Sequence, residues 1–228
     1  MDKITYNLKL TDGKEYTFAV DIERQDRIEV ANKETHSFWT KLNYNQCSNC
    51  PLQASTHKHC PAALDLEEIA EKFYDIISTE RADVWVHTKN RSFFKNCDVQ
   101  EALKSIFGLI MASGSCPILS RLKPLAYFHL PFADLEETVH RLVGTYLIKQ
   151  LLIYREGKYD PVWDLKGIED LYRELEIVNV HFMNRLRDAS NKDASSNALY
   201  IFVTLTSLIA MDINTVLESF VPIVGKGL

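Results

Sequence analysis

Apolar and polar residues alternate along two short stretches near the N-terminus, residues 4–10 and 16–20. Alternation with a period of two is typical of a β-strand that buries one face. The segment 11–14 between the two stretches contains Asp12-Gly13, a pair common in the turns of β-hairpins. The pattern therefore predicts a β-hairpin at the start of the chain.

Other short apolar stretches predict further strands. Residues 84–87 and 92–94 flank a turn at Lys89-Asn90, and we expect them to join the first hairpin in one small antiparallel sheet. Residues 38–44 also have the composition of a strand. The N-terminal part of the chain, residues 1–97, is therefore expected to be rich in β-structure.

Apolar residues recur at helical spacing through most of the remaining chain. Helices are expected at residues 65–77, 99–112, 133–154, 165–188 and 197–220. Asp65 and Glu68 have the spacing of a capping pair for the first of these. The sequence thus predicts an α+β fold that is mostly helical, in which a small N-terminal antiparallel sheet packs on a C-terminal helical bundle formed by residues 98–228. We expect residues 1–228 to form a single domain.

Charge and hydropathy argue against nucleic acid or membrane as a partner. The chain has 26 Lys and Arg against 31 Asp and Glu, a net charge of −5, and no basic run. Nucleic-acid binding requires a concentrated positive field. The first residues lack the apolar core of a signal peptide, and the apolar stretch 198–211 is interrupted by Thr and Ser, which suits a buried helix. We therefore expect a cytoplasmic protein.

Four of the five cysteines have a distribution typical of a metal site. Cys47 and Cys50 form a C-x2-C pair, Cys60 follows in the same polar segment, 46–61, and Cys116 lies further along the chain. The C-x2-C spacing lets two thiolates bind one ion from a tight turn. In a reducing compartment such cysteines are more often bound to metal than joined in disulfides. We predict that these four residues bind zinc, with an iron–sulfur cluster on the same residues as the alternative.

The fourth ligand is open between three residues at this stage: Cys116, His59 and His57. Cys60 and Cys116 each precede a proline and are expected at a helix N-terminus, where the helix dipole stabilises a thiolate. Cys97 fits no ligand pattern and is expected to be a buried structural residue.

A second group of residues suggests an enzyme. Cys116 at the start of a helix could act as a nucleophile, with His129 as its base. Glu137 and His140 have the Glu-x-x-His spacing of di-iron bundles, but the sequence contains no second copy of the pair. An acidic first helical turn, favoured by the helix dipole, is therefore the preferred interpretation of these residues.

A polar corner, residues 184–188, separates two apolar helices. Arg185 or Arg187 in this corner could hold an anion in a pocket. Residues in such corners more often cap helices, and Asp193 or Ser195 would suit the N-cap of the last long helix.

Short motifs that contain these residues are distributed over nearly the whole chain. They are CSNCPL from Cys47, HCPAALDL from His59, CP at Cys116, HLPF from His129, EET from Glu136, and Asp193 with the NAL motif from Asn197. Together they resemble a family of uncharacterised bacterial proteins described as a domain of unknown function. The resemblance implies a bacterial cytosolic protein of this length, and it implies no activity, substrate or catalytic residue.

The sequence therefore predicts a metal-binding protein that acts through a protein partner or in regulation. Zinc is expected to be structural, because a closed site of four thiolates has no open position for a substrate. One alternative is an enzyme with a thiol or metal centre around Cys116, His129 and Glu137. Another is an iron–sulfur redox or sensor protein.

Overall fold

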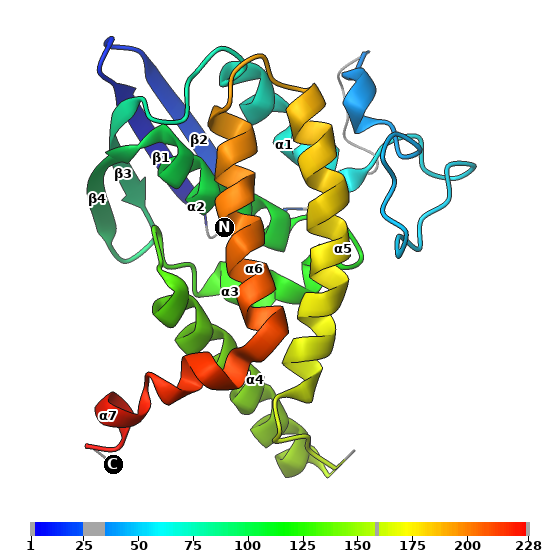
Figure 1. Cartoon of the computed structure of the whole chain (residues 1–228), viewed down its shortest axis with the longest axis vertical. Coiled ribbons are helices and arrows are strands. Elements are labelled where there is room, and N and C mark those ends of the chain that lie inside the picture. Colours follow the sequence, from blue (N-terminus) through cyan, green and yellow to red (C-terminus); the bar gives the residue numbers. More distant parts are fainter. Residues whose placement is uncertain (1–2, 25–34, 158–159, 227–228) are drawn as a thin grey trace.

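A computed structural model of the chain describes residues 3–24, 35–157 and 160–226. Its four strands form one antiparallel sheet in the order β2-β1-β3-β4 (Figure 1). The strands are β1 (Lys3–Leu10), β2 (Glu15–Asp21), β3 (Arg81–His87) and β4 (Ser92–Asp98). The predicted hairpin and its pairing with the two later strands are confirmed.

Strand β1 occupies the centre of the sheet and buries every second side chain. Tyr6 lies opposite Phe18 of β2 on one side and opposite Val86 of β3 on the other. All three side chains are buried, together with Ile4 and Leu8. The period of two in the sequence therefore marks the face of the sheet that packs against the helices.

Most of the described chain is helical. The helices are α1 (Pro61–Lys72), α2 (Val99–Ser113), α3 (Lys123–Tyr127), α4 (Leu135–Glu156), α5 (Lys166–Asp188), α6 (Ala194–Glu218) and α7 (Val221–Val224), with 3-10 turns η1 (Phe38–Thr40) and η2 (Leu119–Leu122). The long helices α5 and α6 lie side by side, and the sheet covers one end of the bundle (Figure 1). The predicted fold class, α+β and mostly helical, is confirmed.

The prediction of a strand at residues 38–44 is wrong. This segment begins with η1 and continues as a loop, in which Lys41 makes one isolated bridge to His59. Trp39 and Thr40 are both buried although they are adjacent, a pattern that a strand with one buried face cannot produce. The strand-like composition of residues 38–44 was therefore misleading, because adjacent residues of this segment are buried.

Helix α1 begins four residues earlier than predicted, at Pro61, with Cys60 at the N-cap. A proline in the first helical turn costs no hydrogen bond, because that N–H would have no intrahelical partner. Asp65 is therefore inside the helix, where it is buried and forms an ion pair with Arg24 at 2.9 Å. The predicted capping pair of Asp65 and Glu68 is wrong.

Helix α6 also begins earlier than predicted, with Asp193 at its N-cap position. The Asp193 carboxylate makes no cap bond to the helix backbone and accepts hydrogen bonds from the backbone N–H and the hydroxyl of Ser78, at 2.8 and 3.0 Å. The start of α6 is thereby attached to the segment that follows α1.

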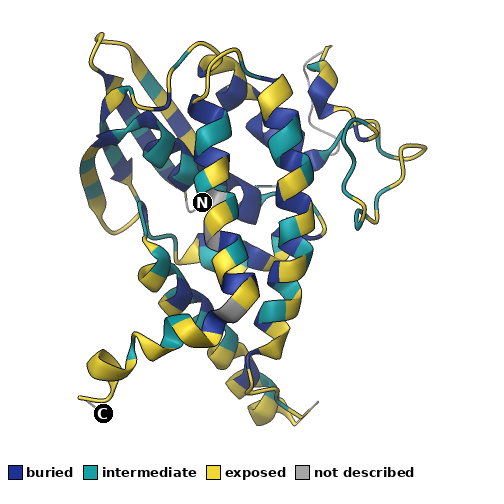
Figure 2. Ribbon diagram, viewed as in Figure 1, coloured by how far each residue is buried: buried dark blue, intermediate teal, exposed yellow. Residues whose placement is uncertain are grey.

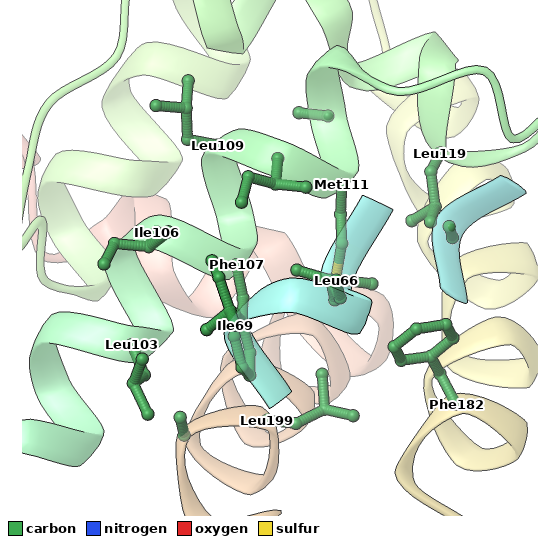
Figure 3. Packing of buried hydrophobic residues seen from close by; sticks show 14 of the residues in the cluster. Leu66, Ile69, Leu103, Ile106, Phe107, Leu109, Met111, Leu119, Phe182 and Leu199 are labelled. Carbon is green, nitrogen blue, oxygen red and sulfur yellow. The ribbon is translucent and has the colours of Figure 1, made fainter. Parts of the chain in front are cut away.

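One hydrophobic core connects the sheet with the helices. Leu66 and Ile69 of α1 pack near Phe107 of α2, Phe182 of α5 and Leu199 of α6 (Figure 3). Between α5 and α6, the buried Asn179 amide donates to the Thr206 hydroxyl at 2.7 Å. Helices α1, α2, α5 and α6 therefore share their apolar faces.

The second half of α4 and α7, at the other end of the bundle, contain several exposed apolar residues. Figure 2 shows much of the ribbon there as exposed. In addition, the segment Ala194–Met211 of α6 is long and apolar enough to cross a membrane by length and composition. Within the described residues it is the one such helix, 44% of the segment is buried, and a core helix of a globular protein meets the same criterion.

Candidate metal centre

The C-x2-C pair lies in a tight turn on the outer side of α5. The Cys50 backbone N–H donates to the Cys47 carbonyl at 3.0 Å, which closes the turn. The Asn49 side chain between them donates to the Glu174 carbonyl of α5, also at 3.0 Å. These hydrogen bonds hold both thiols next to α5, although the segment has little apolar content.

Cys60 is positioned by its own backbone and by the start of α1. Its N–H donates to the Thr40 carbonyl at 2.7 Å. The N–H groups of Ala62 and Ala63 face the sulfur and favour its thiolate form, although neither makes a regular side-chain cap bond. A thiol at this end of a helix is suited to bind a cation as a thiolate.

Cys116 is not the N-cap of a helix, and that part of the prediction is wrong. The chain first forms a turn in which the Ser120 N–H donates to the Cys116 carbonyl at 2.9 Å, and η2 begins only at Leu119. The N–H groups of Ile118 and Leu119 nevertheless face the Cys116 sulfur and favour its thiolate form. The N–H groups of this turn therefore favour the thiolate, as a helix N-terminus was expected to do.

The four thiols are close enough to influence one another. Burial raises the pKa of Cys47 to about 12, and Cys60, Cys116 and Cys50 add to the shift. Burial also raises the pKa of Cys116 to about 11, with further contributions from Cys60 and Cys50. Burial raises the pKa of Cys60 as well, so the electrostatics couple thiols from separate segments of the chain.

Arg185 of α5 lies beside this thiol cluster, which we define as Cys47, Cys50, Cys60 and Cys116. The side chain is 1% exposed, and its guanidinium donates to the backbone carbonyls of Trp39, Lys41 and Leu42. Burial lowers the pKa of Arg185, while Cys60, Cys47 and Cys50 act in the opposite direction. Arg185 therefore connects α5 to the loop 39–42. Its positive charge also lies close enough to the thiols to interact with them electrostatically.

The charge of Arg185 has no carboxylate partner within ion-pair distance in the described part of the chain. Its Nε atom is also buried without a hydrogen-bond partner. A buried cation is costly unless negative charge or hydrogen bonds compensate it. Negative charge on the neighbouring sulfurs would therefore compensate the buried charge of Arg185.

As placed, the thiol cluster does not form a coordination sphere. Residues 3–24, 35–157 and 160–226 contain no group of three or more His, Cys, Asp or Glu side chains arranged to hold a metal ion. All five thiols are free of disulfides, and Cys97 is buried in β4 beside the charges of Glu101 and Lys95.

The two histidines near the cluster have other partners. The Nδ1 atom of His59 is 2.8 Å from the Thr40 hydroxyl, and its ring lies edge-on to His36. The Nδ1 atom of His57 is 2.9 Å from the hydroxyl of Thr56. Of the three candidates for the fourth ligand, Cys116 is the one whose charge is coupled to the other thiols.

The residues of the enzyme alternative have separate contacts. His129 lies against Tyr6 of the sheet, whereas the Glu137 carboxylate accepts from the Asp134 N–H in the capping box of α4. His140 is exposed. Cys116 belongs to the thiol cluster. Cys116, His129 and Glu137 therefore each have different contacts.

Arg185 was singled out in the sequence as a possible anion-binding residue, and its role as a link to backbone carbonyls was missed. Arg187, the other candidate, is exposed and bonds to Asn184. The signal was present in the helical spacing, because Arg185 falls on the same face of α5 as the buried Val178 and Phe182. A charged residue within an apolar stripe indicates a buried polar contact.

The fold and the motifs together define an α+β protein of a family without an assigned activity. The chain belongs to the family described as Domain of unknown function (DUF6901), whose model matches residues 4–223. The comparisons with curated proteins and with solved structures gave no significant match. The predicted resemblance to a family of unknown function is therefore confirmed.

Proposed function

We propose that this chain is a metal-binding protein in which Cys47, Cys50, Cys60 and Cys116 hold one structural zinc ion. The observation that supports the proposal is the electrostatic coupling among the four thiols, three of which also act on Arg185, whose buried charge lacks a carboxylate partner among the described residues. Four thiolates outweigh the charge of Zn²⁺, so the loaded centre is negative and compensates the guanidinium.

The donor set suits zinc in a closed, tetrahedral site. The N–H groups that face Cys60 and Cys116 would stabilise the thiolates of the loaded centre. Loading requires the four side chains to turn toward a common centre, because the described residues contain no group already arranged to hold an ion. The turn that is closed between Cys47 and Cys50 keeps two of the donors together while this happens.

In this proposal the metal joins three parts of the chain: the loop 46–61, the start of α1 and the turn before η2. A closed centre has no open position for a substrate, so its contribution is to hold this surface in one conformation. The protein would then act through a protein partner or in regulation. A reducing compartment such as the cytoplasm would keep its thiols available to the metal.

The proposal is tested by elemental analysis and a visible spectrum of untagged protein purified without chelators. We expect about one zinc per chain, as a single four-thiolate site requires. Replacing any of the four cysteines by serine should reduce the zinc content, whereas Cys97→Ser should retain it. Protein that contains neither zinc nor iron would contradict the proposal.

The same four residues could hold an iron–sulfur cluster, which has visible absorption and would be found as iron in anaerobically purified protein. The enzyme alternative makes a different prediction. It requires a non-protein ligand or an open position at the metal, or a Cys116 thiol that reacts rapidly with alkylating reagents in the metal-loaded protein.

A further inference from the structure

A second feature of the molecule lies away from the thiol cluster. A cavity of about 110 Å³ is lined by residues of α2, η2, α3, α4, α5 and α6. Its apolar wall includes Leu109, Leu122, Leu125 and Ile209. Apolar cavities of this order, about 150 Å³, can hold a six-carbon ring, so the space is sufficient for a small organic group.

Two polar side chains in this wall have unused hydrogen-bonding groups. Tyr172 is 3% exposed, and its hydroxyl has no hydrogen-bond partner in the described chain. Arg141 donates from Nη2 to the Leu125 carbonyl at 2.7 Å, but its Nε atom is buried without a partner. Buried donors in a native protein are nearly always satisfied, so the Nε atom of Arg141 indicates a missing acceptor.

Arg141 also has a charge that the described residues do not neutralise. It forms no ion pair in the described ranges, and no Asp or Glu lines the cavity. Glu137, one turn earlier on α4, favours the charged guanidinium from beyond ion-pair distance, and its carboxylate accepts from the Asp134 N–H. Arg141 and Tyr172 both line this cavity and interact electrostatically.

The polar neighbours of Arg141 provide no negative charge. The Tyr6 hydroxyl is 2.7 Å from the Ser105 hydroxyl and 2.5 Å from Nε2 of His129. Burial and the Arg141 charge lower the pKa of His129 to about 3, so its ring is neutral at pH 7. Lys104 lines the cavity as a second basic group, and it donates to the Ala133 carbonyl at 3.3 Å.

A wider cavity, of about 460 Å³, continues from the first one. The two share His129, Leu130 and Arg141, so Arg141 lies at their junction. The described lining of the wider cavity also contains the exposed side chains of Lys3 and Arg91, and no acidic residue. A basic entrance of this kind attracts anions toward Arg141.

We propose that the two cavities bind a small monocarboxylate with an apolar body. The carboxylate accepts from Arg141 and Tyr172 at the junction, and the apolar body enters the inner cavity beside Leu109 and Ile209. A guanidinium matches the geometry of a carboxylate, and a mostly apolar pocket with few convergent polar groups is typical of a small-molecule site. Inorganic phosphate alone would leave the apolar part empty.

The test uses hexanoate and the neutral alcohol 1-hexanol, which have the same six-carbon chain. Binding is followed by the methyl NMR signals of Leu109, Leu122 and Ile209, which report on this cavity directly. We expect hexanoate to shift these signals in a saturable way and to bind at least about tenfold more tightly than 1-hexanol, since a charge-assisted hydrogen bond is lost with the alcohol.

Two variants separate recognition from folding. Tyr172→Phe removes a hydroxyl that has no protein partner, so the melting temperature should be unchanged while hexanoate binds about fivefold to tenfold more weakly. Arg141→Gln should weaken hexanoate binding by at least about tenfold. Arg155→Gln, on the exposed end of the same helix, is the matched control and should bind hexanoate normally.

Several results would overturn the proposal. These are the absence of methyl shifts at millimolar hexanoate, equal affinity for hexanoate and 1-hexanol, and displacement of hexanoate by equimolar inorganic phosphate. Unchanged hexanoate affinity in a folded Tyr172→Phe protein would equally contradict the assigned contact. The test is carried out at one fixed metal content, and Leu109 of α2 and Ile209 of α6 report from helices that contain none of the four clustered cysteines.

Discussion

The guanidinium of Arg185 on α5 donates a hydrogen bond to the backbone carbonyl of Leu42 at 3.0 Å. A single helical side chain thereby holds the chain a few residues before the C-x2-C turn. The same guanidinium reaches the carbonyls of Trp39 and Lys41. The loop is therefore attached to the bundle by the protein itself, and a metal would add to an arrangement that already exists.

Replacing Arg185 by Met should destabilise the protein by about 2–4 kcal/mol, because three backbone carbonyls, two of them in buried hydrogen bonds, would lose their donor. It should also lower the affinity for zinc, since the compensating positive charge is lost. Urea unfolding and zinc titration measure the two effects. Arg187→Met, two residues away on the exposed side of α5, is the control and should change unfolding by less than about 0.5 kcal/mol. Equal effects of the two substitutions would contradict the role given to Arg185.

Cys116→Ser should lower the melting temperature and the zinc content while most of the helical circular dichroism remains. The helices share a core that does not depend on the loop, whereas the segment 46–61 has mostly exposed or half-buried residues. Closing the chain between Cys60 and Cys116 through a metal restricts the unfolded state, an effect of up to several kcal/mol by analogy with a disulfide.

Limited proteolysis should therefore cut the Cys116→Ser protein first within residues 46–61. Cys97→Ser tests whether loss of any buried thiol has this consequence, and it should leave both the zinc content and the cutting site unchanged. Complete loss of the helical signal in the metal-free protein would show that the ion is needed for the whole fold.

Stability should decrease as the pH falls from about 6.5 toward 3, in part because of His129. Burial and Arg141 lower the pKa of His129 to about 3, whereas an unfolded histidine has a pKa near 6.5. Between these values the unfolded chain binds the extra proton, so the stabilising effect is complete above the unfolded pKa and is lost below it. His129→Asn should reduce the slope of stability against pH in this window by up to about 1.4 kcal/mol per pH unit. Identical slopes for the two proteins would show that His129 is protonated in the folded state.

Gly114→Ala should destabilise the protein by about 1–3 kcal/mol. A Cβ atom at Gly114 would collide with the Asp65 carboxylate and lie 3.1 Å from Nη2 of Arg24, so the ion pair would have to move. Gly144→Ala provides the opposite control, because it lies inside α4 with nothing within 4 Å of the added atom. Helix propensity predicts a stabilisation of about 0.5–1 kcal/mol there. Thermal unfolding of the two variants tests whether Gly114→Ala lowers the stability and Gly144→Ala raises it.

Most of the elements could be predicted from local pattern. Strand β1 was predictable because its buried positions alternate, and α5 because apolar residues recur along one face. The segment 38–44 was not, because its conformation depends on Arg185, which is far away in the sequence. The start of α1 was missed because a proline in the first helical turn was not weighed against the later acidic pair.

The two candidate sites differ in how far the sequence could indicate them. The spacing of Cys47 and Cys50 is local, so the thiol cluster could be proposed before the structure was known. The cavity beside Arg141 is lined by Tyr172 of α5 and Ile209 of α6, which come from different helices. Each of these residues has an ordinary place in its own apolar pattern, so no local signal marks them as neighbours.

The most direct test of the central claim is X-ray absorption spectroscopy at the zinc edge of the purified full chain. The account predicts four sulfur ligands at about 2.3 Å and no nitrogen or oxygen ligand. In the Cys116→Ser protein one sulfur should be lost or the zinc should be absent. A first shell that contains nitrogen or oxygen in the unchanged protein, or fewer than four sulfurs, would contradict a closed site formed by Cys47, Cys50, Cys60 and Cys116.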